Sequence, residues 1–406
     1  MSFDATAVRA QFPMLARPPD GRPLHYLDNA ATSQVPRAVV DAVDAYETGG
    51  RANVRRGVYR LAERATEAYE AARRSVAGYL GVDAGEVIFT SGATAALNLV
   101  AYAFGDILAP GDEVVISEAE HHSNIVPWQM LRDRRGVVVK VLPVTGEGRL
   151  DTAGLDGVVG SRCRLVAVTH VSNVTGAVTD VAAIVDAART VGARVLLDGA
   201  QRTPHGPPDL PALGVDFYAF SGHKMFAPTG VGVLWGRREV LEAMPPFLGG
   251  GEMIRTVGFE RTTYAPPPHK FEAGTPPIAQ AIGLGAACDW LTGLDWPAVS
   301  AHEFTLTQRL LDGLDRFAGV RVIGPPGLQD RVGVVSFDLD GAHPHDVCEI
   351  LDRLGVAARG GHHCAQPLVE RFGLAGTTRA SIALYNDAAD IDALFSGLEE
   401  AARVLT

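Results

Sequence analysis

Runs of apolar and β-branched residues alternate with helix-like segments between about residues 86 and 235. Seven of these runs predict buried strands: EVIFT (86–90), DEVVIS (112–117), VVVKVLPV (137–144), RLVAVTH (164–170), ARVLLD (193–198), DFYAFS (216–221) and VGVLW (231–235). Three segments between them predict helices: ALNLVAYAF (96–104), IVPWQMLRD (125–133) and AAIVDAART (182–190). This alternation is typical of an α/β fold with a largely parallel sheet. We therefore predict an α/β domain with a mostly parallel seven-stranded sheet.

Proline and glycine concentrate after this domain, in MPPFLGGGEM (244–253) and YAPPPHKFEAGTPP (264–277), which predict loops. A helix near residues 278–295 leads to a smaller unit. Its candidate elements are the strands RVGVVSFDL (331–339) and RASIALY (379–385), the helix HPHDVCEILDRLG (343–355) and a closing helix at about 387–404. We divide the chain into an N-terminal segment (1–20) that packs with the small domain, a large α/β domain (21–280) and a small C-terminal α+β domain (281–406).

Composition narrows the classes of partner. The chain has 406 residues and a net charge of -11, which disfavours nucleic acid and anionic membranes as partners because both select basic surfaces. No run of about 18 apolar residues is present, and the N-terminus lacks the apolar region of a secretory signal. Four widely spaced cysteines without a CxxC pair argue against disulfides and a zinc site, so we expect free thiols and no metal. Without a secretory signal, we expect a cytoplasmic location.

Polar residues follow several of the predicted strands, where open α/β sheets bind their ligands. SGAT (91–94) is a glycine-containing turn that opens a helix, so its N–H groups and Thr94 can hold a phosphate. Asp198 ends one strand and Lys224 follows another. These two residues suit pyridoxal phosphate, because a carboxylate can face its ring nitrogen and an amine can react with its aldehyde. This cofactor acts as an electron sink for a carbanion formed next to the substrate nitrogen.

Two further strand ends add side chains of the same kind. His121, after DEVVIS, can stack on a flat cofactor and move protons near neutral pH. Asn173, after RLVAVTH, can bond the hydroxyl of the cofactor ring or a substrate carboxylate. In this order along the chain, the residues predict a pyridoxal-phosphate site.

The stretch RGGHHC (359–364) places a cysteine in a polar context that is a poor environment for a buried apolar residue. The thiolate is the reactive form of cysteine, and nearby positive charge favours it. Arg359, His362 and His363 are the candidates for that charge. We therefore predict that Cys364 is a reactive thiol.

Nine motifs in this order resemble the class V aminotransferase-like family of fold type I, and among its branches the SufS-type (group II) cysteine desulfurases. They are YLDNAAT, SGATAALNLV, EHHSNIVPWQ, THVSNVTG, DGAQ, FSGHKMFAPTG, FEAGTP, RGGHHCAQPL and RASIALYN. The resemblance covers residues 8 to 404 approximately. It implies a pyridoxal-phosphate homodimer with active sites at the subunit interface. It also implies conversion of L-cysteine to L-alanine, with a persulfide passed to an acceptor protein for assembly of iron–sulfur clusters or other thio-cofactors.

The resemblance also implies a role for each matching residue. Lys224 matches the lysine that binds the cofactor covalently, Asp198 the residue at the pyridine nitrogen, and Cys364 the cysteine that forms the persulfide. Gln201 matches the residue that bonds the phenolic oxygen, and His121 the stacking histidine. The phosphate ligands match Thr94, Ser221 and His223, with Thr275 supplied by the partner subunit. The substrate carboxylate is assigned to Asn173 and Arg379, and Arg359 is included with the substrate-binding residues.

Two positions depart from the family pattern. Arg55 replaces a histidine that the family has near the active site, and we expect it to add permanent positive charge near the entrance. Ala95 replaces a glutamate, so an interface contact is expected to be absent. The alternatives to a cysteine desulfurase are a selenocysteine lyase, another class V β-lyase or epimerase, and a catalytically silent scaffold. Cys364 argues against an epimerase, and the complete set of site residues argues against a scaffold.

Overall fold

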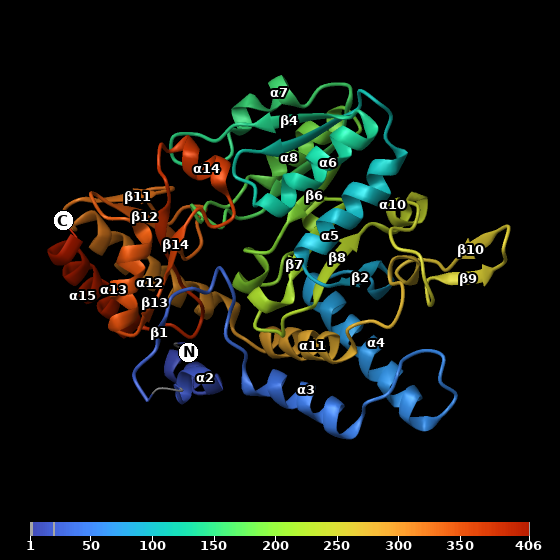
Figure 1. The fold of residues 1–406 in the computed structure, drawn as a ribbon, viewed down its shortest axis with the longest axis horizontal. Helices are drawn as coiled ribbons and strands as arrows, with labels where there is room; N and C mark the ends of the chain where they lie inside the picture. Colours follow the sequence, from blue (N-terminus) through green and yellow to red (C-terminus); the bar gives the residue numbers. More distant parts are fainter. Residues whose placement is uncertain (1–2, 19–20, 406) are drawn as a thin grey trace.

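The computed structural model describes residues 3–18 and 21–405. Its main feature is a seven-stranded sheet with the order β2-β8-β7-β6-β5-β3-β4 (Figure 1). The strands are β2 (Val87–Thr90), β3 (Glu113–Ser117), β4 (Val138–Leu142), β5 (Cys163–Thr169), β6 (Arg194–Asp198), β7 (Phe217–Ser221) and β8 (Gly232–Gly236). β8 runs antiparallel to the other strands of this sheet, which are parallel to one another. The prediction of seven strands in a mostly parallel sheet is confirmed, because each apolar run forms one of them.

Helices cover both faces of this sheet because successive strand residues point to opposite sides. On one face, Val87 and Phe89 of β2 share a core with the helices α3, α4, α8 and α11. On the other face, Ile88 shares a core with α5, α6 and α10. The bounds of these helices are α3 (Arg37–Gly49), α4 (Arg60–Leu80), α5 (Ala93–Leu99), α6 (Val126–Arg135), α8 (Val181–Thr190), α10 (Arg238–Ala243) and α11 (Ile278–Thr292). α5 continues into a π-helical turn at Val100–Phe104.

The C-terminal part of the chain forms a second, antiparallel sheet with the order β11-β12-β15-β14. Its strands are β11 (Val320–Ile323), β12 (Val334–Leu339), β14 (Arg359–Gly361) and β15 (Thr377–Ser381). Apolar side chains of β12 pack with α12 (Trp296–Asp315), α13 (Pro344–Arg353) and α15 (Ala388–Leu405). Parallel pairing joins β1 (His25–Tyr26) to β13 (Val356–Ala357). The smaller α+β unit expected from the sequence is therefore present.

Short elements complete the fold: α1 (Ala5–Arg9), α2 (Pro13–Ala16), α7 (Leu155–Val158), α9 (Leu210–Leu213) and α14 (Gln366–Arg371). Arg9 of the N-terminal segment pairs with Asp390 of α15 at 3.0 Å. The division of the chain at residues 20 and 280 stays a prediction, and residue 280 lies within α11, which packs on α3 and α4. Residues 1, 2, 19 and 20 of the predicted N-terminal segment lie outside the described residues.

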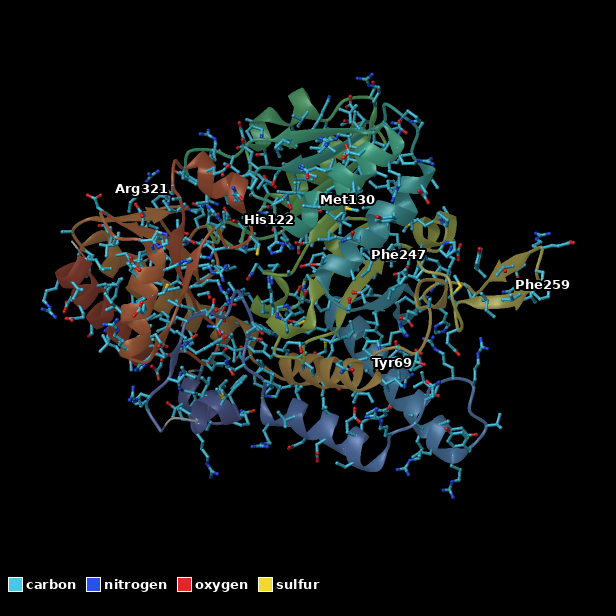
Figure 2. All side chains as sticks on the ribbon, in the orientation of Figure 1. Tyr69, His122, Met130, Phe247, Phe259 and Arg321 are labelled. Atoms are coloured by element: carbon cyan, nitrogen blue, oxygen red, sulfur yellow. The ribbon has the colours of Figure 1, made fainter. Side chains whose placement is uncertain are left out.

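Two local predictions were wrong or incomplete. Between the two proline-rich segments, β9 (Ile254–Val257) and β10 (Thr262–Tyr264) form a hairpin that projects from the molecule, with Phe259 at its tip (Figures 1 and 2). The predicted strand at 379–385 is shifted, because β15 ends at Ser381. The residues after Ser381 are apolar because they pack in the core and not because they form a strand. Tyr385, for example, packs against Phe12 with ring centroids 4.6 Å apart.

In the described ranges, no helix has the length and hydropathy that a membrane span needs.

Candidate active site

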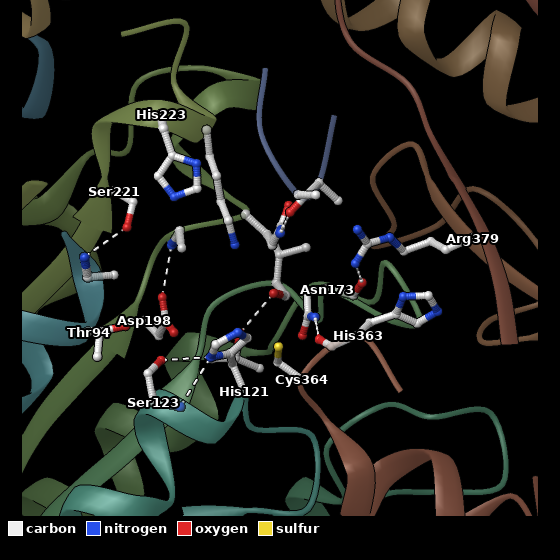
Figure 3. Close-up of a pocket in the computed structure, with 18 of the residues that line it drawn as sticks. Thr94, His121, Ser123, Asn173, Asp198, Ser221, His223, His363, Cys364 and Arg379 are labelled. Atoms are coloured by element: carbon white, nitrogen blue, oxygen red, sulfur yellow. Dashed lines mark hydrogen bonds between the residues drawn. The ribbon is translucent and has the colours of Figure 1, made fainter. Parts of the chain in front are cut away.

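A cavity of about 280 Å³ lies at the carboxyl ends of β5, β6 and β7 (Figure 3). All of the predicted site residues except Thr275 line it: Thr94, His121, Asn173, Asp198, Gln201, Ser221, His223, Lys224, Arg359, Cys364 and Arg379. Because parallel strands end at one edge of a sheet, residues distant in the sequence converge there. The structure thus brings the predicted residues together, whereas their individual roles stay predictions.

Lys224 and Asp198 form the charged centre of the cavity. Asp198 is buried at the end of β6, and its Oδ1 accepts from the N–H of Ala200 at 3.0 Å. Burial raises the pKa of Asp198, while Lys224 acts in the opposite direction. Burial also lowers the pKa of Lys224 to about 8, although Asp198 favours its charged form. A lysine with this pKa is partly neutral slightly above neutral pH, and a neutral amine is the nucleophilic form.

The turn between β2 and α5 supplies one end of the cavity. Ser221 Oγ accepts from the N–H of Ala93 at 2.8 Å, which joins the end of β7 to the start of α5. Gly92 has φ +151°, and a Cβ at Gly232 would lie 2.4 Å from the Cα of Gly92. Gly92 is therefore favoured by its positive φ, and Gly232 is required by the close approach of the two backbones.

His121 lies in the loop that follows β3. Its Nδ1 accepts from the backbone N–H of Ser123 at 3.1 Å. Burial lowers the pKa of His121 to about 4, and the positive charges of Lys224 and Arg379 add to this effect. The ring is therefore neutral at neutral pH. Because Nδ1 accepts, the neutral ring carries its proton on Nε2.

The two predicted amide ligands already make hydrogen bonds to the backbone. Gln201 Nε2 donates to the carbonyl of Ala30 at 2.7 Å. Asn173 Nδ2 donates to the carbonyl of His363 at 2.6 Å. Asn173 therefore holds the segment that carries Cys364, a role that the sequence did not predict.

Arg359 and Arg379 share one carboxylate, that of Asp28. Arg359 Nη2 lies 2.8 Å and Arg379 Nη2 lies 3.3 Å from Asp28 oxygens. Arg379 is almost fully buried, and burial lowers its pKa to about 10, so it stays charged at neutral pH. Asp28 was missed by the sequence analysis, although it lies in the motif YLDNAAT. The order of motifs gives no sign that it is the counter-ion of both arginines.

Cys364 is the exposed one of four free cysteines, and its sulfur points into the cavity (Figure 3). Its carbonyl accepts from the N–H of His122 at 2.7 Å. The prediction that His363 supplies positive charge is wrong. Burial lowers its pKa to about 2, and its Nε2 contacts Thr377 Oγ1 at 2.8 Å, so His363 is a neutral structural residue.

The expectation for Arg55 also needs correction. Arg55 does not line the cavity of its own chain, and its side chain is only 13% exposed. Its Nη2 bonds Glu272 at 2.6 Å, so its charge is neutralised in the interior. Thr275, three residues after Glu272, is exposed and also outside the cavity lining. The expected role of Thr275 toward a second subunit therefore stays a prediction. No contact in the structure explains why Ala95 replaces the family's glutamate.

Comparison with known proteins places the chain in a family. The aminotransferase class-V family model matches residues 25–394. A probable cysteine desulfurase of Streptomyces coelicolor is 51% identical over 404 residues, which cover 98% of this chain and 97% of that protein. The structure of the cysteine desulfurase CsdA from Escherichia coli, in an S-sulfonic acid form, has a TM-score of 0.92 at 40% identity and full coverage of both chains.

A second structure contains the cofactor. A mutant of C-DES with glycine covalently linked to PLP has a TM-score of 0.83 at 25% identity, and the match covers 97% of this chain and 99% of that one. The chain belongs to the aminotransferase class-V family of fold type I enzymes. The resemblance stated from the nine motifs is thus confirmed at the level of this family, and its near relatives carry the name cysteine desulfurase.

Proposed function

We propose that this chain is a pyridoxal-phosphate-dependent cysteine desulfurase that converts L-cysteine to L-alanine and keeps the sulfur as a persulfide on Cys364. The observation that carries the proposal is the presence of Cys364, Lys224 and Asp198 in the lining of one cavity. Relatives that are 44–51% identical over nearly the whole chain and are named cysteine desulfurases support it.

The chemistry of the lining fits pyridoxal phosphate. Asp198 is a buried carboxylate that suits the ring nitrogen, and Lys224 is an amine of lowered pKa that suits the aldehyde. Thr94, Ser221 and His223 lie beside a glycine turn that suits the phosphate. His121 is proposed to stack on the ring, and Gln201 to bond its phenolic oxygen. When bound, the cofactor supplies an electron sink for the bond-breaking step.

The arginines recognise the carboxylate of the substrate in this proposal. Arg379 is fixed by the carbonyl of Asn173 at 3.0 Å and remains charged while buried. Its planar guanidinium can bind a carboxylate through two hydrogen bonds. In the described structure, Asp28 occupies part of this donor set. A substrate carboxylate would therefore compete with Asp28 for Arg379, and Arg359 would keep Asp28 in place through its shorter contact.

Cys364 then takes the sulfur. Its thiolate attacks the sulfur of the substrate cysteine, so that an S–S bond forms while the Cβ–S bond of the substrate breaks. The electron pair of the broken bond stays with the carbon skeleton, which gains a proton and leaves as alanine. Neutral His121, with its proton on Nε2, can transfer a proton within the cavity.

The remaining parts of the proposal concern assembly. We propose a symmetric homodimer in which Thr275 of a second copy contributes to the phosphate site. We also propose a cytoplasmic sulfur-acceptor protein and a role in assembling iron–sulfur clusters or other thio-cofactors. The exposure of both Thr275 and Cys364 supports these proposals, because each must reach a second molecule.

The test is to incubate the purified holoenzyme with L-cysteine and a reductant. Alanine and sulfide should appear in equal amounts, and brief exposure without reductant should add one sulfur to the peptide that contains Cys364. Sulfur added to the buried Cys163 or Cys288 instead would refute the assignment of the acceptor. Absence of alanine would refute the proposed activity.

A further inference from the structure

The segment that carries Cys364 has a backbone conformation that requires support. His363 and Cys364 have φ angles of +54° and +57°, two consecutive left-handed residues that are not glycine. L-residues resist this region, and such residues persist only where surrounding contacts hold them. We define residues 362–366 as the cysteine loop, and contacts from several segments hold its backbone in this conformation.

Two of these contacts fix the His363 side of the loop. Asn173 Nδ2 donates to the His363 carbonyl at 2.6 Å, and the His363 ring contacts Thr377 Oγ1 at 2.8 Å. Asn173 follows β5 of the large sheet, and Thr377 begins β15 of the small one. Both contacts precede Cys364, so they leave the following residues of the loop to be held by another group.

His122 holds the loop at Cys364 and beyond it. Its backbone N–H donates to the carbonyl of Cys364 at 2.7 Å. Its ring Nε2 accepts from the N–H of Gln366, the first residue of α14, at 3.1 Å. Ala365 occupies the N-cap position of α14 and has no side chain that can accept this hydrogen bond. The ring of His122 therefore caps α14 from a distant segment, and Figure 2 shows His122 between the large sheet and the C-terminal elements.

We propose that His122 is a positioning residue for Cys364, an inference that rests on the proposed function. His122 directly follows His121, which lines the cavity. Its two hydrogen bonds enclose Cys364, since one is made to Cys364 itself and the other to Gln366. The three-residue turn at His122–Asn124 thereby fixes the thiol that accepts sulfur relative to the histidine that moves protons.

The acceptor atom of the ring defines the test. His122→Phe removes the acceptor and keeps the backbone N–H, whereas His122→Gln keeps an oxygen acceptor of similar reach. We expect the backbone amides of Gln366, Leu368 and Val369 to exchange hydrogen roughly fivefold faster in the His122→Phe holoenzyme, as for the loss of a helix cap; Pro367 has no amide hydrogen. The kcat for cysteine should fall roughly two- to fivefold, with KM and cofactor content unchanged. His122→Gln should return both measurements to within about twofold of the original protein.

His343→Phe is the matched control, because His343 Nδ1 caps α13 by accepting from the N–H of His345 at 3.3 Å. It should speed exchange in α13 and leave the exchange of Gln366, Leu368 and Val369 unchanged. Unchanged exchange in His122→Phe, or a His122→Gln variant that behaves like His122→Phe, would overturn the proposal. Exchange is measured without substrate, so its outcome does not depend on desulfurase activity. An inactive parent enzyme would therefore refute the proposed function separately.

Discussion

Substitution of Glu272 should reveal how much its buried ion pairs with Arg73 and Arg55 contribute to stability. Arg73 donates to both carboxylate oxygens of Glu272, at 2.6 and 2.9 Å. Arg55 donates to Oε2 of the same carboxylate at 2.6 Å. The N–H of Phe89 donates to Oε1 at 2.9 Å. Burial alone would raise the pKa of Glu272, but Arg73, with smaller contributions from His269 and Arg55, holds it well below its ordinary value. Glu272 is therefore ionised and is the shared counter-ion of two arginines.

Glu272→Gln leaves both arginines without this counter-ion. Removing one partner of a buried ion pair costs about 3–5 kcal/mol. Glu70 still contacts Arg73 at 2.8 Å and is 27% exposed, so it offsets a part of that cost. We expect a loss of about 3 kcal/mol in the free energy of unfolding. Arg55→Gln should cost only about 1 kcal/mol, because Arg73 continues to pair with Glu272 and a partly desolvated cation is removed.

The measurement is urea unfolding near neutral pH, at one protein concentration for all variants because we propose a dimer. A depressed pKa contributes stability above the unfolded-state value of about 4.3, and this contribution is lost as pH falls toward the folded value. The difference between Glu272→Gln and the parent should hence be constant near neutral pH and shrink in acid. Asp392→Asn, in the exposed pair Arg309–Asp392, is the control and should change stability by less than about 0.5 kcal/mol. A larger loss in Arg55→Gln than in Glu272→Gln would refute the reasoning.

Three further outcomes follow from the cavity. Lys224→Ala should abolish the covalent linkage to the cofactor and turnover of cysteine, and unchanged turnover would exclude Lys224. Uptake of pyridoxal phosphate by the apoprotein should accelerate with pH around a midpoint near 8, because the amine of Lys224 reacts when neutral; a flat profile from pH about 6 to 9 would contradict this. Cys364→Ala should retain the cofactor and lose cysteine turnover but largely keep selenocysteine turnover, since selenium leaves carbon more readily than sulfur. Alanine formed from cysteine at the parent rate would show that Cys364 is not the acceptor.

The sequence predicted the large sheet well because most of its strands are buried on both faces. Such strands have an apolar centre, as in the LVAV of RLVAVTH, and the pattern does not depend on their partners. The edge strand β4 is partly exposed, and its β-branched valines marked it instead. The hairpin β9–β10 was missed because it is largely exposed, with Val257 67% exposed, so no buried pattern marks it. The strand at 379–385 was placed too late because apolar residues continue past Ser381 into a core contact made by Tyr385.

The identities of the residues in the cavity could be predicted, but their pairing could not. Residue types and motif order place Lys224 and Asp198 at strand ends, and a sheet edge brings strand ends together. Ion pairs join residues that are far apart in the chain, as for Arg55 with Glu272 and Arg359 with Asp28. Nothing in the sequence selects one carboxylate among the many, so the charge of Arg55 was expected near the entrance and lies instead in the interior.

The contacts around Cys364 show why the site depends on how the two sheets meet. Asp198 ends β6 of the large sheet and Lys224 lies in the turn that follows β7, whereas Cys364 and Arg379 belong to the C-terminal elements. Asn173 joins the two groups twice, because its amide holds the His363 carbonyl and its carbonyl holds Arg379. Because Asn173 follows β5 of the large sheet, a shift of one sheet relative to the other would lengthen both hydrogen bonds. Asn173 therefore opposes a change in the distance from the thiol and the carboxylate-binding arginine to Lys224.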